Sequence, residues 1–110
     1  MKHSKHSVAR MSQRGITHAM AALVLAYGFT RGDKVILNTK DATARLIEAR
    51  CEKDDLSAKL DNGTKDVSGV MYQLAEIETE IRNLTKLIDK HGCVLVMLDD
   101  VLITVYRLDH

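Results

Sequence analysis

Five side chains near the two ends of this 110-residue chain are of the kinds that bind and cleave a phosphodiester. His6, Arg10 and Arg14 recur every four residues, so a helix would hold them on one side. Thr104 and Tyr106 alternate, so a strand would hold them on one face. Imidazole is a general base or acid near neutral pH, guanidinium binds phosphate through paired hydrogen bonds, and hydroxyls orient it. Converging on one cleft, these groups would hold a phosphodiester.

Each of these residues also has an ordinary structural explanation, and the sequence leaves both explanations open. A histidine so near the start of a chain as His6 is usually a solvated side chain. Arg10 and Arg14 can cap helix carbonyls or pair with acids, and Thr104 and Tyr106 can simply fill the surface of a sheet. The catalytic assignment of all five is therefore a hypothesis about their arrangement in space.

Capping residues predict two short helices within the first thirty residues. Ser4 or Ser7 can cap the first helix, which ends before Gly15. Thr17 is a good N-cap for the second helix, and Gly28 stops it. Apolar residues at helical spacing give the second helix one apolar face: Met20, Leu23, Val24 and Tyr27.

Residues 41–91 have the pattern of an antiparallel helical hairpin. The second half carries apolar residues at steps that alternate between three and four, which is the spacing of a heptad seam. A weaker series of the same kind precedes it, and the turn chemistry of residues 61–63 lies between the two. Asp41 fits the cap position of the first helix, and Gly92 closes the second. The two series are Ala42, Leu46, Ala49, Lys53, Leu56 and Leu60, then Val67, Val70, Leu74, Ile77, Ile81, Leu84 and Ile88.

Three segments have the pattern of strands. Residues 34–38 form a short one, and the continuously apolar residues 93–98 are typical of a central strand covered on both faces. A tight turn then leads to residues 101–108, in which alternation places Leu102 beside the two hydroxyl residues on one face. The predicted fold class is α+β, with N-terminal helices on a small, mostly antiparallel sheet and an inserted long antiparallel helical hairpin.

The composition fits one small domain spanning residues 1–110. No proline interrupts the helices, and a single phenylalanine with no tryptophan leaves an aliphatic core. No apolar run approaches the roughly 18 residues of a membrane span, and no secretory signal is seen, so a cytoplasmic location is expected. Cys51 and Cys93 lie outside any metal-site spacing and are expected to be reduced thiols, with no metal and no cofactor.

Charge is unevenly spread, although the formal net charge is only +1. Residues 1–34 carry six basic residues and one acid, whereas residues 41–90 carry eight basic residues and eleven acids. The basic front attracts a polyanion, and the acidic middle repels one. A solvated basic segment explains the front equally well, so charge alone does not identify a partner.

The two ends together resemble a bacterial family of short proteins classed as a domain of unknown function. The likeness covers residues 3–40 and 92–107, through His-Ser-x-x-Arg-Met, Gln-Arg-Gly-Ile, a helix ending in Tyr-Gly and a final Ile-Thr-Val-Tyr-Arg. That family looks like a branch of the barnase–EndoU–colicin–RelE fold, whose active members are metal-independent RNases and often toxins. The resemblance implies an RNase-like protein with RNA or an antitoxin-like protein as partner. The matching residues are His6, Ser7, Arg10, Met11, Gln13, Arg14, Gly15, Ile16, Tyr27, Gly28, Leu37 and residues 103–107.

The hairpin of residues 41–91 departs from that family, in which a short segment joins the first strand to the last two. Apolar residues that flank its seam, chiefly Met71 and Leu87 with Ile47 and Cys51, predict a partner-binding surface and a homodimer. Two hypotheses therefore remain. The chain is an RNase-like enzyme acting through its terminal residues, or a non-catalytic interaction protein that dimerises or binds a protein partner through the hairpin.

Overall fold

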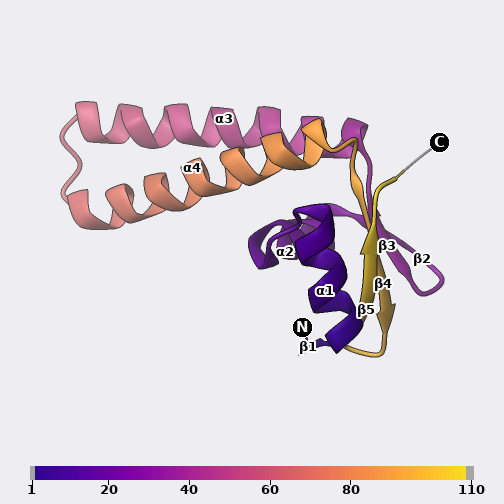
Figure 1. Cartoon of the computed structure of the whole chain (residues 1–110). Coiled ribbons are helices and arrows are strands. Elements are labelled where there is room, and N and C mark those ends of the chain that lie inside the picture. The colour runs from indigo at the N-terminus through magenta and orange to yellow at the C-terminus, as the bar shows by residue number, and fades with distance from the viewer. Residues whose placement is uncertain (1, 109–110) are drawn as a thin grey trace.

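The computed structural model describes residues 2–108, which form a small body with a long helical arm extending from it (Figure 1). Within these residues the body holds a five-stranded sheet with two helices on one face, and the arm consists of α3 and α4. The chain is therefore α+β, as the sequence predicts, and the principal dimensions of 48 × 27 × 23 Å reflect the arm. In order, the elements are β1 (Lys2–His3), α1 (Lys5–Arg14), α2 (His18–Tyr27), β2 (Phe29–Arg31), β3 (Lys34–Leu37), α3 (Thr39–Asp61), α4 (Val67–Asp89), β4 (Cys93–Leu98) and β5 (Val101–Tyr106).

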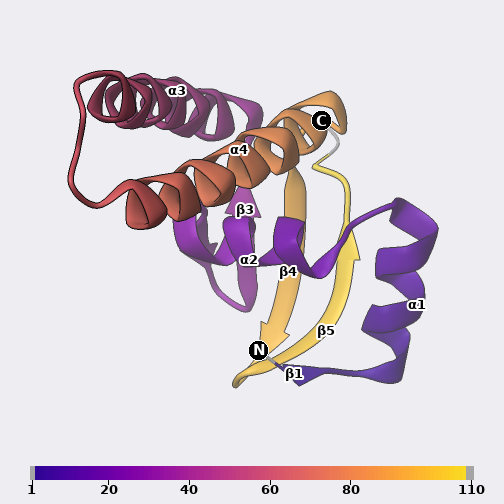
Figure 2. The same ribbon diagram turned by 90° about the vertical axis from the view of Figure 1, so that its left-hand side faces the viewer.

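Ser4 fixes the start of α1 and joins it to the sheet. Its hydroxyl accepts a hydrogen bond from the backbone N–H of Ser7 (3.0 Å) and donates one to the carbonyl of Ile103 on β5 (3.1 Å). Ser7 is fully buried, and its own hydroxyl donates back to the carbonyl of Ser4. At the other end α1 stops at Gly15, whose φ of 67° is left-handed. These contacts hold α1 alongside β5 (Figure 2).

The start and end of α2 agree with the sequence. Thr17 caps the helix by accepting a hydrogen bond from the backbone N–H of Met20 (3.1 Å). Gly28 follows the last turn, and a Cβ placed there would lie 2.7 Å from the carbonyl oxygen of Ile36. Only glycine lets the chain pass so close to β3. Directly after it the chain forms β2, which pairs antiparallel with β3.

The sheet has the strand order β1-β5-β4-β3-β2, which makes β4 its central strand. Its neighbours pair antiparallel except for β1 and β5, so the prediction of a mostly antiparallel sheet is confirmed. A bulge where Val96 and Met97 of β4 meet β5 interrupts the alternation of side chains. Leu102 and Val105, three residues apart, both lie in the core as a result. The expectation that Leu102 shares a face with the two hydroxyl residues is wrong.

The arm is the predicted antiparallel hairpin, with small differences at its ends. Asn38, rather than Asp41, caps α3, because its side chain accepts a hydrogen bond from the backbone N–H of Asp41 (2.8 Å). Asp66 caps α4 by accepting one from Gly69 (3.1 Å). No helix within residues 2–108 is both long and apolar enough to cross a membrane. The heptad seam packs the two helices together around Leu46, Ala49, Ile77 and Leu84.

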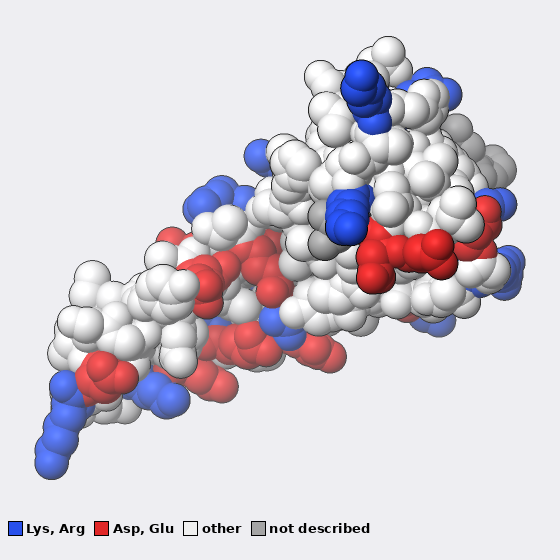
Figure 3. Space-filling view, turned by 90° about the horizontal axis from the view of Figure 1, so that it is seen from below, with Lys and Arg blue, Asp and Glu red and all other residues white. Residues whose placement is uncertain are grey.

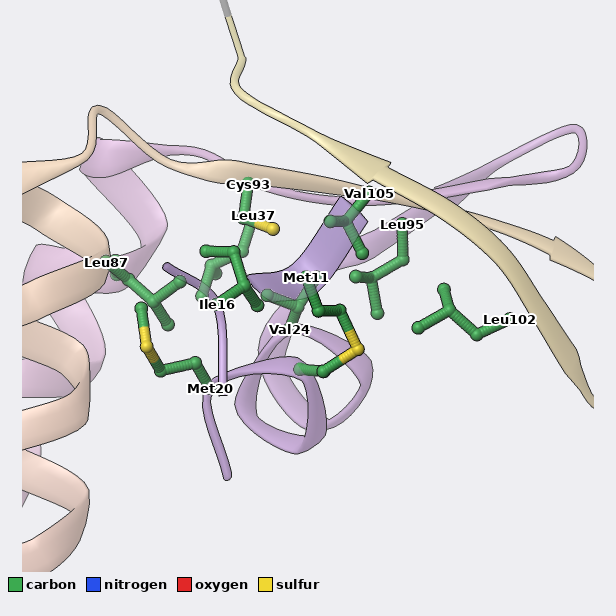
Figure 4. Close-up of a cluster of buried hydrophobic side chains, with 12 residues drawn as sticks. Met11, Ile16, Met20, Val24, Leu37, Leu87, Cys93, Leu95, Leu102 and Val105 are labelled. Atoms are coloured by element: carbon green, nitrogen blue, oxygen red, sulfur yellow. The ribbon is translucent and has the colours of Figure 1, made fainter. Parts of the chain in front are cut away.

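The core of the body lies between the sheet and the helices, and the last turns of α4 complete it (Figure 4). Leu87 of α4 is fully buried there, beside Met20 of α2. The prediction that Leu87 is exposed for a partner is therefore wrong, because the base of α4 lies over the body rather than clear of it. Met71, toward the far end of the arm, is 57% exposed, as predicted. Ile47 and Cys51 are exposed as well.

A group of polar and aromatic side chains, the arm-base cluster of Tyr27, Arg45, Glu52 and Glu80, ties the arm to the body. Arg45 of α3 pairs with Glu52 (2.9 Å) and with Glu80 of α4 (2.7 Å). Glu80 also accepts a hydrogen bond from the hydroxyl of Tyr27 (3.2 Å), whose ring centre lies 4.8 Å from the Arg45 guanidinium. The hydrogen bonds to Glu52 raise the pKa of Arg45, and burial raises the pKa of Tyr27. Three helices are thereby joined at one point.

Candidate nucleic-acid interface

The five predicted catalytic residues do not meet in one cleft. His6 lies in the first turn of α1 with its side chain exposed. Arg10 follows one turn later, partly buried, and its guanidinium donates a long hydrogen bond of 3.5 Å to the side-chain oxygen of Gln13. The Nε atom of Arg10 is buried without a hydrogen-bond partner among the described residues. Both side chains therefore belong to the surface of α1 itself.

Thr104 and Tyr106 lie on the face of the sheet opposite the core. Their partners on β4 are Val96 and Val94, whereas Leu95 between these two is in the core. Since cross-strand partners share a face, the two hydroxyl residues share one, as predicted. Among the described elements, no helix covers this face in Figure 1. The helix that carries His6 packs against the other side of the sheet, through core residues such as Met11.

Arg14 and Tyr106 do meet, in a depression of about 750 Å³ where α1, α4 and β5 all end. We name it the basic depression. Asp89 is the one carboxylate that lines it among the residues described. The cations in its lining are Arg14, Lys86, Lys90 and Arg107, and the remaining lining residues are Gln13, Gly15, Ile16, Gly92 and Tyr106.

Local contacts hold the ends of the three elements together around the basic depression. A Cβ at Gly15 would lie 2.9 Å from the Nζ atom of Lys90, so a side chain at this position would displace the ammonium group. The Nε–H of Arg107 donates a hydrogen bond to the carbonyl of Lys90 (3.4 Å). Lys90 therefore lies between the end of α1 and the end of β5.

Within residues 2–108, no ion pair neutralises the cations of the basic depression. No carboxylate of residues 2–108 lies within salt-bridge distance of Arg14, Lys86, Lys90 or Arg107. Some of this charge is offset by the partial negative charge at the C-terminal ends of α1 and α4. The rest is available to an anion, with guanidinium forks for paired hydrogen bonds and the hydroxyl of Tyr106 at the edge.

Sequence reasoning missed Lys86 and Lys90, which are half of the cations in the depression. Both belong to the last turns of the arm, and the negative balance of residues 41–90 concealed them. A signal was available in Gly92, because a helix that stops there and leads directly into a central strand must bring its last turn to the end of that sheet. Arg107, in contrast, belongs to the final motif of the resemblance and does line the site.

Two histidines form a separate pair away from the depression. The Nδ1 atom of His18 lies 3.2 Å from the Nε2 atom of His3, with the rings edge to face and their centres 4.5 Å apart. Burial, together with the neighbouring His18, lowers the pKa of His3. No group of three or more His, Cys, Asp or Glu side chains within residues 2–108 is arranged to hold a metal ion. Of the two free thiols, Cys93 is buried, which raises its pKa to about 12.

Comparison with known proteins gives no relative for this chain. No family model, no curated protein and no solved structure matches it. The resemblance of the two ends to an RNase-like family therefore rests on the residues of the sequence alone.

Proposed function

We propose that the protein binds RNA in the cytoplasm through the basic depression. One observation carries this proposal: four cations from three distant parts of the chain line one depression, beside a single carboxylate among the described residues. Cations without an ion-pair partner among residues 2–108 favour binding of a phosphate backbone, because they release its condensed counterions. The RNase-like resemblance of the two ends supports RNA as the polyanion.

The face of the sheet opposite the helices offers the RNA bases two aromatic rings, one of them at the depression. Backbone pairing sets Phe29, Ile36, Val94 and Tyr106 in one row across four strands, and the two aliphatic residues in the middle of the row are buried, at 7% and 1% exposure. Tyr106 borders the depression, while Phe29 at the far end is 39% exposed with the Arg31 guanidinium 5.9 Å from its ring centre. Aromatic rings on a sheet stack against unpaired bases. This arrangement favours single-stranded RNA over a duplex.

The geometry supports binding rather than cleavage by His6. A general base must come within roughly 2.6–3.2 Å of the proton it removes, directly or through one water. His6 lies in the first turn of α1 and Arg14 in the last, about 12 Å apart along the axis at 1.5 Å per residue. We therefore propose that the chain recognises RNA, and that His6 does not catalyse the toxin-like cleavage that the resemblance implies.

Fluorescence anisotropy with a labelled single-stranded RNA of about 20 nucleotides, at several salt concentrations, tests the proposal. Four phosphate contacts give a slope of about −2.8 in a plot of log K against log salt concentration. Lys90→Ala and Arg107→Ala should each weaken binding and each make the slope shallower by about 0.7. A duplex of the same length should bind less tightly, because its bases cannot stack on the sheet.

Lys59→Ala and Lys65→Ala are matched controls, since they remove the same charge near the far end of the arm. Both should leave affinity and salt slope unchanged. Equal losses of RNA affinity in the arm variants and the depression variants would mean that RNA is attracted by charge in general and does not bind at one site. That result would contradict the proposal. The RNA should also be recovered intact, and cleavage that His6→Ala abolished would overturn the separation of His6 from the bound strand.

A further inference from the structure

The cations of the basic depression converge on one place. The Nζ atom of Lys90 lies at the end of α1, 2.9 Å from where a Cβ of Gly15 would be, and so next to Arg14 along the chain. Arg107 reaches the same place from the end of β5, because its Nε–H donates a hydrogen bond to the carbonyl of Lys90 (3.4 Å). Lys86 precedes Lys90 by one turn of α4 and lines the depression with it. Three elements therefore bring their charge to one hollow.

The side chains of these cations keep most of their hydrogen-bond donors free within residues 2–108. Those of Arg14, Lys86 and Lys90 make no hydrogen bond and no ion pair there. The hydrogen bond of Arg107 uses only its Nε–H, which leaves both terminal amino groups of the guanidinium. The backbone N–H of Gly15, in contrast, is bonded to a carbonyl of α1. Side chains, rather than the backbone, would therefore hold an anion in the depression.

The net charge of the depression fits a phosphate group with two negative charges. Its four cations and one carboxylate give a net charge of +3. Both α1 and α4 end here, and each helix end contributes about half a negative charge, which leaves about +2. A phosphate within an RNA strand carries one negative charge. A phosphomonoester, such as the phosphate at the end of a strand, carries about −1.5 to −2 near pH 7 and has three acceptor oxygens.

The row of cations on α4 stops before the arm. Arg82 precedes Lys86 by one turn, and its guanidinium donates a hydrogen bond to the hydroxyl of Thr79 (3.0 Å). One turn further, the same side of the helix carries Glu78. Figure 3 shows carboxylates along the underside of the arm, which would repel an RNA strand laid along it. The site therefore does not continue along the arm.

The cations also stop along α1. The next lysine or arginine with an exposed side chain is Lys5, nine residues before Arg14 and about 14 Å away along the axis at 1.5 Å per residue. Arg10 between them is partly buried and donates a hydrogen bond to the side chain of Gln13 (3.5 Å). A groove that follows an RNA backbone carries cations along its length. The depression lacks such a continuation on either helix, which favours a strand that ends in it.

We propose that the basic depression receives the terminal phosphate of an RNA strand, that is, a phosphomonoester at its 5′ or 3′ end. This inference rests on the proposed function of RNA binding and specifies which part of the RNA the depression holds. The guanidinium groups of Arg14 and Arg107 bind the phosphate oxygens through paired hydrogen bonds, and Lys90 binds between them. The ring of Tyr106 stacks on the last base. The strand then leaves across the face of the sheet opposite the helices.

A competition experiment tests this proposal. Unlabelled single-stranded RNAs of one sequence, which differ only at their ends, displace a fluorescently labelled RNA from the protein. One competitor carries a 5′-phosphate, one a 3′-phosphate, and one has hydroxyl groups at both ends. One of the phosphorylated competitors should bind at least about tenfold more tightly than the hydroxyl-ended RNA, the usual gain from hydrogen bonds to a charged group. The tighter competitor identifies the end that the depression receives.

Two variants and a matched control locate the phosphate. Arg14→Ala and Lys90→Ala should bring the ratio of the two affinities close to one, because they remove cations that bind the terminal phosphate. Arg82→Ala removes a cation of the same α4 row outside the depression, and it should keep the wild-type ratio. Circular dichroism of each variant checks that it is folded.

The pH dependence of the ratio is an independent measurement. The second proton of a phosphomonoester binds with a pKa of about 6, so the ratio should fall toward one between about pH 7.5 and about pH 5. Lysine and arginine side chains stay protonated over this range, and the hydroxyl-ended RNA corrects for any other change in the protein.

The outcomes separate this proposal from the proposed function. Equal competition by all three RNAs, with binding that Lys90→Ala weakens, overturns the terminal-phosphate proposal and leaves RNA binding in the depression in place. A ratio that Arg82→Ala lowers as much as Lys90→Ala does places the phosphate outside the depression, and it also overturns the proposal. A wild type that binds no RNA overturns both.

Discussion

The two sides of the α4 base differ in whether their charged side chains form ion pairs. On one side the arm-base cluster surrounds Arg45 with carboxylates at 2.7 and 2.9 Å and with the ring of Tyr27. On the other side Lys86 and Lys90 enter the basic depression, and no carboxylate of residues 2–108 reaches either of them. Within a few turns, α4 therefore carries Glu80, which is paired with Arg45, and two lysines that no carboxylate of residues 2–108 pairs with.

This contrast separates structural from functional charge. A guanidinium that is paired, hydrogen-bonded and mostly buried stabilises the angle between arm and body. Cations left open to solvent contribute little to the fold, and they retain their attraction for an external anion. Substitutions on the two sides of α4 should therefore affect different measurements, with stability changing on the first side and binding on the second.

The largest expected effect is on Leu87, in the part of the base that completes the core. Leu87→Ala should lower the free energy of unfolding by about 2–5 kcal/mol, because it opens a cavity in a packed region. Urea denaturation followed by circular dichroism measures this. Met71 is the exposed residue that the sequence analysis groups with Leu87 as partner-binding. Met71→Ala should change the free energy of unfolding by less than about 0.5 kcal/mol. Similar losses in both variants would mean that the base of α4 is not part of the core.

Arg45→Ala comes next, with an expected loss of about 2–3 kcal/mol, because it leaves the Glu80 carboxylate partly buried without its cation. Arg50→Ala, on the same helix and exposed, should lie within about 0.5 kcal/mol of the wild type. Replacing Arg45 and Glu80 together by methionine should recover much of the loss, since no charge is then stranded. A double variant weaker than Arg45→Ala alone would contradict this account of the arm-base cluster.

Lys86→Ala and Lys90→Ala should each cost less than about 1 kcal/mol, which is the usual value of a cation near a helix C-terminus. The loss should shrink further in high salt, because these side chains are open to solvent. Thermal melts at low and high salt check both statements. A cost of several kcal/mol that salt does not change would mean that the two lysines stabilise the fold, as Arg45 does.

The smallest expected effect is that of His6→Ala. The side chain is exposed on the first turn of α1, so stability should change by less than about 0.5 kcal/mol. RNA affinity should stay at the wild-type value, because the basic depression lies at the other end of the helix. Anisotropy titrations of the two proteins side by side decide this, and a clear loss of affinity would extend the RNA site along α1.

The arm is the part of the fold that the sequence predicts best, because its determinants are local. Heptad spacing, the turn at residues 61–63 and a glycine stop all act over a few residues, and α3 and α4 follow them closely. Asn38 was missed as the cap because Asp41 offers the same chemistry three residues later. The short strands β1 and β2 were missed for a related reason, since two or three residues carry too little pattern.

The candidate site was harder to predict, because it depends on contacts between distant segments. Helical spacing predicts that His6 and Arg14 lie on one side of α1, but it carries no information about which end of α1 meets the sheet edge. Whether Leu87 packs on a partner or on the body depends on the angle at which the arm leaves, which the arm-base cluster sets. Thr104 and Tyr106 were placed correctly relative to each other, since strand alternation is local.

The arm begins and ends on neighbouring strands, because Leu37 at the end of β3 pairs with Cys93 at the start of β4. Its far half makes no contribution to the core of the body. One heptad can therefore be removed from each helix, or added to each, with the seam still in phase and the sheet unchanged. Every such step alters the reach of the arm by about 10 Å at 1.5 Å per residue. Arm length is thus a property that evolution, or a protein engineer, can adjust independently of everything the body does.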